Sequence, residues 1–133
     1  MRQTATEGSP EGGGEKQKGG LLQPIVDILA FFAAARQYGY VDILANALDP
    51  LTAKEALINA IRDYKSVCSK SDYVERSDGE KVKCPRVDPS TLEAAVGWLD
   101  KELGSRSPSK ILDLTRTLAL RALARSEVFK VPG

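Results

Sequence analysis

The longest apolar run of the chain lies between residues 21 and 38, where the sequence LLQPIVDILAFFAAARQY is rich in alanine and large aliphatic side chains. Its length and alanine content predict a helix. Pro24 falls in the first turn, where a missing N–H costs little, and Gly39 is typical of the position just past a helix end. At 100° per residue, Gln23 and Asp27 fall on one narrow polar strip. We therefore expect this helix to be buried on most sides, within a bundle or against another subunit.

Three later helices have clear start signals. Asp49-Pro50 and Asp88-Pro89 each place an N-cap residue before a proline, and Ser107-Pro108 opens the last helix. Apolar residues then recur at helical spacing after each signal. The predicted helices cover about residues 50–68, 89–104 and 108–126, after a short amphipathic turn at residues 41–48.

Residues 73–84, YVERSDGEKVKC, change to the period of strands. The turn residues Ser77-Asp78-Gly79 predict a small hairpin here. Cys68 and Cys84 enclose fifteen residues. A disulfide between them would tie the hairpin to the helices and stabilise the fold by about 3 kcal/mol in the chain-entropy model. The alternative is two free thiols, and the residues leave both open.

The first twenty residues hold more than half of the eleven glycines and, after Met1, no large aliphatic or aromatic side chain. Such a segment cannot repay its ordering entropy by itself. We expect a flexible N-terminal arm at 1–20, a helical domain at 21–133 and an extended tail at 127–133 that lies on a neighbouring subunit. The expected fold class is all-α: a four-helix bundle with an extended N-terminal arm and a small β-hairpin between its second and third helices.

Composition narrows the possible functions. The 133 residues amount to one domain, and 19 Lys and Arg offset 18 Asp and Glu, so the whole molecule carries no field of a single sign. Histidine is absent, which removes imidazole bases and ligands. We find no apolar stretch that could span a bilayer and no signal-peptide layout. These features favour a soluble protein that is not an enzyme and needs no metal or cofactor; an enzyme that uses only carboxylates and lysines is the remaining catalytic alternative.

Positive charge gathers near the C-terminus, where residues 106–133 hold six basic and two acidic side chains. Lys110, Arg121 and Arg125 fall within about 60° of one another on the wheel of the last helix. This basic stripe predicts contacts with nucleic-acid phosphates, although an ordinary solvated helix face would look the same. The arm would add further basic groups from Arg2, Lys16 and Lys18.

Three short stretches carry a resemblance to a known family. Gln37-Tyr38-Gly39 closes an alanine-rich apolar helix, and Leu103-Gly104-Ser105 joins two helices, the second of which opens at Ser107-Pro108. With the glycine-rich arm, this layout resembles the major capsid proteins of rod-shaped and filamentous viruses of hyperthermophilic archaea. The resemblance implies a four-helix core with an N-terminal extension, whose paired copies, of this chain or of this chain and a sister subunit, wrap double-stranded DNA.

The resulting hypothesis is a structural capsid subunit, located in a virion assembled in the host cytoplasm, that polymerises into a helical filament and coats double-stranded DNA without sequence specificity. The alternative is a small helical protein–protein interaction module or DNA-binding regulatory module. In the capsid hypothesis, large apolar side chains are buried within and between subunits. The interface residues expected are Leu21, Ile25, Ile28, Phe31, Phe32 and Phe129.

Overall fold

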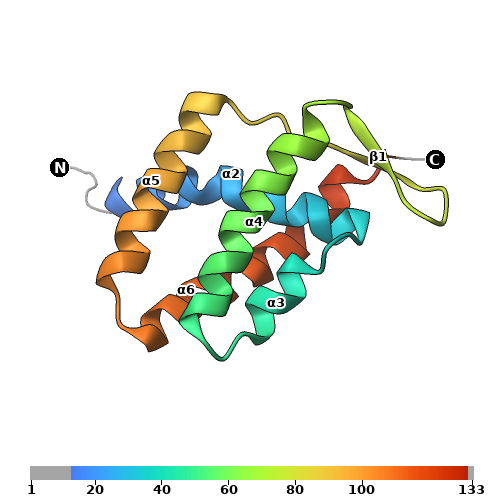
Figure 1. Cartoon of the computed structure of the whole chain (residues 1–133). Coiled ribbons are helices and arrows are strands. Elements are labelled where there is room, and N and C mark those ends of the chain that lie inside the picture. The colour runs from blue at the N-terminus through green and yellow to red at the C-terminus, as the bar shows by residue number, and fades with distance from the viewer. Residues whose placement is uncertain (1–12, 132–133) are drawn as a thin grey trace.

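The chain folds into helices packed around one central helix, with a two-stranded hairpin at one end (Figure 1). The computed structural model describes residues 13–131, with side chains from residue 21 onward. The elements in chain order are α2 (Gly13–Ala35), α3 (Tyr40–Asn46), α4 (Pro50–Cys68), β1 (Tyr73–Glu75), β2 (Lys81–Lys83), α5 (Pro89–Ser105), α6 (Pro108–Arg125) and the 3-10 helix η1 (Ser126–Phe129). The mostly helical fold with its small antiparallel hairpin confirms that part of the prediction.

Helix α2 is the central element. Its side chains are buried around most of the circumference, and Ile25, Ile28 and Phe31 are fully inaccessible to solvent. It packs against α3, α4, α5, α6, η1 and β2. In Figure 1, α2 crosses behind α4 and α5 instead of running alongside them, so the four-helix bundle is not confirmed.

The predicted start of the first helix at Leu21 is wrong, because α2 begins at Gly13. Glu15, Lys16 and Lys18 are good helix formers. Once the buried part of the helix is formed, each added residue gains one backbone hydrogen bond without a new nucleation step. Residues 1–12 of the predicted arm lie outside the described part of the chain.

Helices α4 and α5 begin where the sequence predicts. The side chain of Asp49 accepts a hydrogen bond from the backbone N–H of Leu51, and that of Asp88 accepts one from Thr91. In both helices proline occupies the first helical position, where its fixed φ is already helical. The capping carboxylates therefore fix the residue at which each of the two helices begins.

The chain leaves α2 through a turn with unusual backbone conformations. The N–H of Arg36 donates to the carbonyl of Ala33, and that of Gln37 donates to Phe32, the two bonds of a Schellman motif. Arg36 occupies the left-handed position of this motif with φ 55°, where glycine is usual, and Tyr38 also has a positive φ of 64°. A non-glycine side chain in this region costs about 1–2 kcal/mol.

The hairpin is joined to the rest of the fold at several points. Val74 pairs with Val82 across the two strands, and the inward Val82 is fully buried. A disulfide joins Cys68 at the end of α4 to Cys84 just after β2. An isolated hairpin is marginally stable in water, so these attachments are what allow two three-residue strands to persist.

The C-terminal segment packs on its own chain, whereas the sequence analysis placed it on a neighbouring subunit. Phe129 is 7% exposed, Lys130 forms a bridge with Val82, and the N–H of Val131 donates to the carbonyl of Lys81 over 3.0 Å. The tail thus adds to the free edge of β2. The expectation failed because an apolar residue near a chain end does not reveal which surface it covers.

Replacing Arg36 with glycine should raise the free energy of unfolding by about 1 kcal/mol, because glycine adopts the left-handed conformation without strain. Chemical denaturation of the variant and the wild type measures the difference. Gly104→Ala provides a control for general glycine effects, since a Cβ at Gly104 meets nothing within 4 Å and its φ is not positive. A loss of stability in Arg36→Gly would contradict the strain at this turn.

Removing the disulfide should lower the free energy of unfolding by about 3 kcal/mol, because the bond closes a loop of about fifteen residues in the unfolded chain. Denaturation of the Cys68→Ala/Cys84→Ala variant, and of the wild type with and without reductant, measures this loss. Intact mass must also rise by two hydrogens on reduction. An unchanged mass, or equal midpoints in all samples, would show that the bond is absent.

Candidate functional site

The basic stripe predicted on α6 faces the polar strip of α2. The Nε of Arg125 donates to Oδ1 of Asp27 at 2.5 Å, and Nη2 of Arg121 donates to Oε1 of Gln23 at 3.5 Å. Arg125 also lies over the ring of Phe129, 5.8 Å from its centre. These two arginines therefore link α6 to α2, and the phosphate contacts predicted for them rest on the sequence alone.

No described contact places the other predicted phosphate-binding residues next to Arg121 and Arg125. Lys110 is exposed in the first turn of α6. Lys16 and Lys18 lie in α2, but their side chains are outside the described part of the structure, and so is the whole of Arg2. The prediction of a shared phosphate-binding surface rests on the sequence alone.

The residues expected at a subunit interface lie inside a single chain. Ile25, Ile28 and Phe31 are 0% exposed and Phe32 is 1% exposed. Leu21 is half-buried against the same core, and Phe129 in η1 belongs to this core with 7% exposure. Five of the six are thus unavailable to a partner, because α3 to α6 already surround α2.

Arg76 is a structural residue that the sequence analysis missed. It is 8% exposed, and its Nη1 donates to the carbonyl of Ala34 in the last turn of α2 at 3.3 Å. Its Nη2 pairs with the carboxylate of Asp78 at 2.5 Å. The N–H of Glu80, and then Arg76, hold the pKa of Asp78 below its ordinary value. The acidic residues around the turn indicate an ion pair, but no local pattern indicates the distant Ala34.

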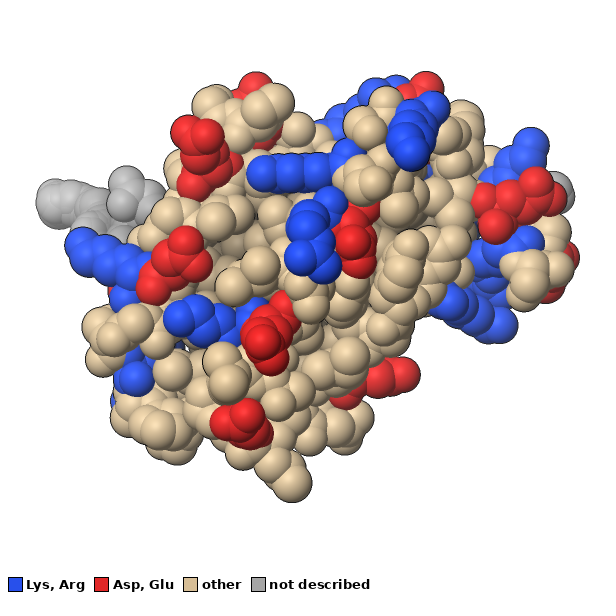
Figure 2. All heavy atoms as spheres, viewed as in Figure 1, with Lys and Arg blue, Asp and Glu red and all other residues tan. Residues whose placement is uncertain are grey.

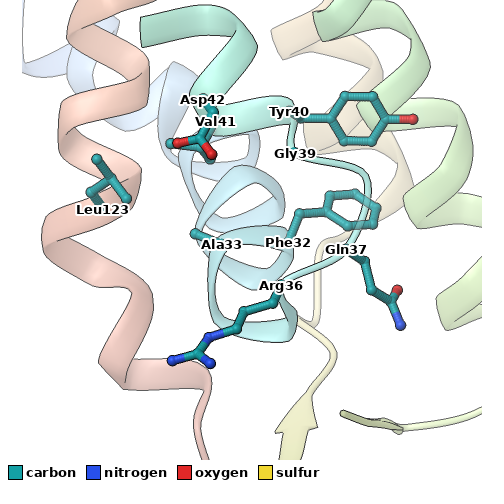
Figure 3. A pocket seen from close by; sticks show the side chains of 9 residues that line it. All are labelled: Phe32, Ala33, Arg36, Gln37, Gly39, Tyr40, Val41, Asp42 and Leu123. Carbon is teal, nitrogen blue, oxygen red and sulfur yellow. The ribbon is translucent and has the colours of Figure 1, made fainter. Parts of the chain in front are cut away.

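A small hollow lies where α2 ends and α3 begins (Figure 3). Its volume is about 250 Å³, and Leu123 of α6 forms the opposite wall. In Figure 3, the rings of Phe32 and Tyr40 point away from α6, while Arg36 and Asp42 lie apart on the α6 side. The hollow is smaller than most ligand pockets, and its polar groups do not converge on one point.

Tyr40 joins this turn to α4. Its ring stacks on that of Tyr38 with the centres 5.6 Å apart, and its hydroxyl donates to the carboxylate of Asp63. Burial, followed by the hydrogen bond and charge of Asp63, raises the pKa of Tyr40 to about 12. The protonated phenol is therefore part of the folded structure.

A longer groove runs between α4 and α5. The two helices lie side by side and antiparallel in Figure 1, and both pack on α2. Two hollows of about 350 Å³ each follow one another along the groove and share Lys65. Leu57, Ile61 and Leu99 form an apolar floor, each less than 9% exposed. Figure 2 shows this face as uncharged surface interspersed with both basic and acidic side chains.

The two rims of the groove carry opposite charges. Arg62 and Lys65 line the α4 side, while Glu93 and Asp100 line the α5 side. Arg62 keeps 69% of its side chain exposed although it lies 3.8 Å from Asp63. Ile58, 48% exposed, adds an apolar side chain to the α4 rim. The groove thus combines a hydrophobic floor with one basic and one acidic edge.

One end of the groove is fixed by links across the chain. The hydroxyl of Tyr64, on α4, donates to the carbonyl of Pro85 at 2.8 Å, and the Cys68–Cys84 disulfide lies one turn away. Both links join α4 to the segment that leads into α5. They hold the two walls at a set spacing, and burial raises the pKa of Tyr64 at this end.

Within residues 13–131, no group of three or more His, Cys, Asp or Glu side chains is arranged to hold a metal ion. Among the helices described, none is both long and apolar enough to cross a membrane.

The Tyr40 phenol predicts a pH dependence of stability. Because its pKa rises from 10.0 to about 12 on folding, its contribution is complete below pH 10 and is lost as the pH rises towards 12. Urea unfolding across this range should show a steeper loss of stability for wild type than for Tyr40→Phe. Tyr73→Phe, on the exposed face of β1, is the control and should follow the wild type. Parallel curves for Tyr40→Phe and wild type would contradict the assignment.

Comparison with known proteins identifies the family. No curated protein and no solved structure matches the chain. One family model, described as CRISPR-associated protein (Cas_Csa5), matches residues 28–104, which run from the middle of α2 to the end of α5.

This match corrects the function proposed from the sequence. The resemblance to viral capsid proteins is wrong, and so are the virion location, the filament of paired subunits and the double-stranded DNA coat. The alternative of an interaction or regulatory module has no support from the match either. The resemblance failed because Gln37-Tyr38-Gly39 and Leu103-Gly104-Ser105 are short glycine-containing stretches of a kind found near the ends of many helices. Since the match covers more than half of the 133 residues, the chain belongs to the Cas_Csa5 family of CRISPR-associated proteins.

Proposed function

We propose that this chain is a non-catalytic subunit of a CRISPR–Cas interference complex, where it contributes a rigid helical surface to neighbouring Cas proteins. The observation that carries the proposal is the family match over residues 28–104. That segment contains α4, the hairpin and nearly all of α5, and so includes both walls of the groove. The α6 stripe lies outside it.

The chemistry of the chain supports a role without catalysis. Histidine is absent from the sequence, and Cys68 and Cys84 are bonded to each other, so neither thiol is available as a nucleophile. The strongest perturbation of a pKa is at Tyr40, whose buried phenol stays protonated and bound to Asp63. These groups act in the fold, where the phenol and the carboxylate join the start of α3 to α4.

The structure is also suited to the role of a rigid scaffold. A disulfide, the buried Arg76 and the Arg125–Asp27 pair each link segments that are far apart in the chain. A protein surface that is rigid before binding loses less conformational entropy on association. The small net charge of +1 gives no overall field for long-range attraction to nucleic acid.

Co-expression with the Cas proteins of the same host should yield one particle that contains this chain. Affinity purification through a tag on another Cas subunit, followed by native mass spectrometry, measures its presence and stoichiometry. A complex that assembles and purifies without the chain, with the chain recovered separately as a monomer, would overturn the proposal. The same complex assembled without this chain is the control for non-specific capture.

A further inference from the structure

We propose that the α4–α5 groove binds an amphipathic helix of a neighbouring Cas subunit, which presents carboxylates to the α4 rim and basic side chains to the α5 rim. This inference rests on the function proposed above, and it names the surface and the kind of segment that this surface receives.

The dimensions of the groove fit a helix. Its lining on α4 runs from Leu57 to Ser69, which at 1.5 Å per residue is about 18 Å, or roughly three helical turns. Its walls are two antiparallel helices (Figure 1), and apolar side chains line the floor between them. A third helix placed along such a groove contacts both walls through residues spaced three and four apart.

The partner helix would bury its apolar side chains against the floor of the groove. Leu57, Ile61, Leu99 and Leu103 belong to the core, yet each also lines the open hollow between the helices. Ile58 on the rim remains 48% exposed. Because the floor residues are at most 8% exposed, the apolar surface removed from water would be mainly that of Ile58 and of the partner's own aliphatic side chains, at about 25 cal/mol per Å².

The charges of the two rims select the orientation and the charge pattern of the partner helix. Arg62 and Lys65 lie along α4, and Glu93 and Asp100 lie along α5, so a bound helix meets positive charge on one side and negative charge on the other. A helix with acidic residues on one flank of its apolar stripe and basic residues on the other is complementary in a single orientation. A helix with the reversed pattern places like charges together.

The same charges argue against two other occupants. A nucleic-acid backbone requires a net positive surface, whereas the two acidic and two basic rim residues cancel. A second copy that faced this one groove to groove would leave the space between the two concave surfaces unfilled. A convex helix with the complementary pattern of charges satisfies both shape and charge.

The groove is already formed in the chain without a bound partner. The Cys68–Cys84 bond and the Tyr64–Pro85 hydrogen bond fix one end, and packing of both helices on α2 fixes their depth. Loss of the disulfide should therefore weaken binding as well as folding, because the walls then have to be ordered on association.

The test uses the full chain and the Cas complex purified without it. Ile58→Glu should weaken incorporation at least tenfold, because it places a charge on the apolar edge of the groove. Since Ile58 is half-exposed, the variant is expected to fold, and circular dichroism checks this. Leu120→Glu is the matched control: Leu120 is 65% exposed on α6, away from the groove, and its variant should bind as the wild type does.

A second measurement identifies the occupant. A photo-crosslinking amino acid at Ile58 should join the chain to an amphipathic helical segment of another Cas protein, identified by mass spectrometry. Crosslinking to RNA, to DNA or to a second copy of this chain would overturn the groove proposal, and so would unchanged incorporation of Ile58→Glu. Failure of the wild type to join the complex would instead overturn the proposed function, which keeps the two outcomes distinct.

Discussion

The burial of α2 is the constraint on which the rest of the structure depends. A helix that is apolar around most of its circumference cannot be covered by one neighbour, so α3, α4, α5, α6, η1 and β2 all contact it. Each fully buried Ile, Leu or Phe contributes about 1.5–3 kcal/mol relative to an exposed position. The polar strip of α2 is accommodated by Arg121 and Arg125, which satisfy Gln23 and Asp27 from α6. Surrounding one helix therefore uses both the apolar and the basic side chains of the others.

The same constraint produces the groove. Helices α4 and α5 direct their apolar faces to α2, and a hollow with an apolar floor of nearly buried side chains remains between them. Because the disulfide and the Tyr64–Pro85 hydrogen bond fix the approach of the two helices at one end, the groove does not close by small shifts of its walls. A surface formed in this way is available to another protein without rearrangement of the core, and this links the packing of the fold to the function proposed above.

The sequence predicted local features well and long-range partners poorly, and particular residues show why. Asp49 and Asp88 cap helices through bonds to residues two and three positions away, so their role could be read from spacing. Arg76 contacts Ala34 across 42 positions, and Arg125 contacts Asp27 across 98. The helical wheel placed Arg121 and Arg125 correctly on one side of their helix, but it carried no information on what that side faces. The rims of the groove were missed for the same reason, since Arg62 and Asp100 belong to helices separated by the hairpin.

What the sequence by itself determined were the later helices, the hairpin and the strongly buried character of the segment from residue 21 onward, because these depend on periodicity, caps and turn residues within a few positions of one another. Tertiary structure alone decided that α2 is buried within one chain, that the tail completes the edge of β2, and that Arg121 and Arg125 of α6 contact α2. The presence of an apolar or charged side chain in the sequence indicates only that the side chain needs a partner in the folded structure. Which partner it finds depends on how the whole chain is packed.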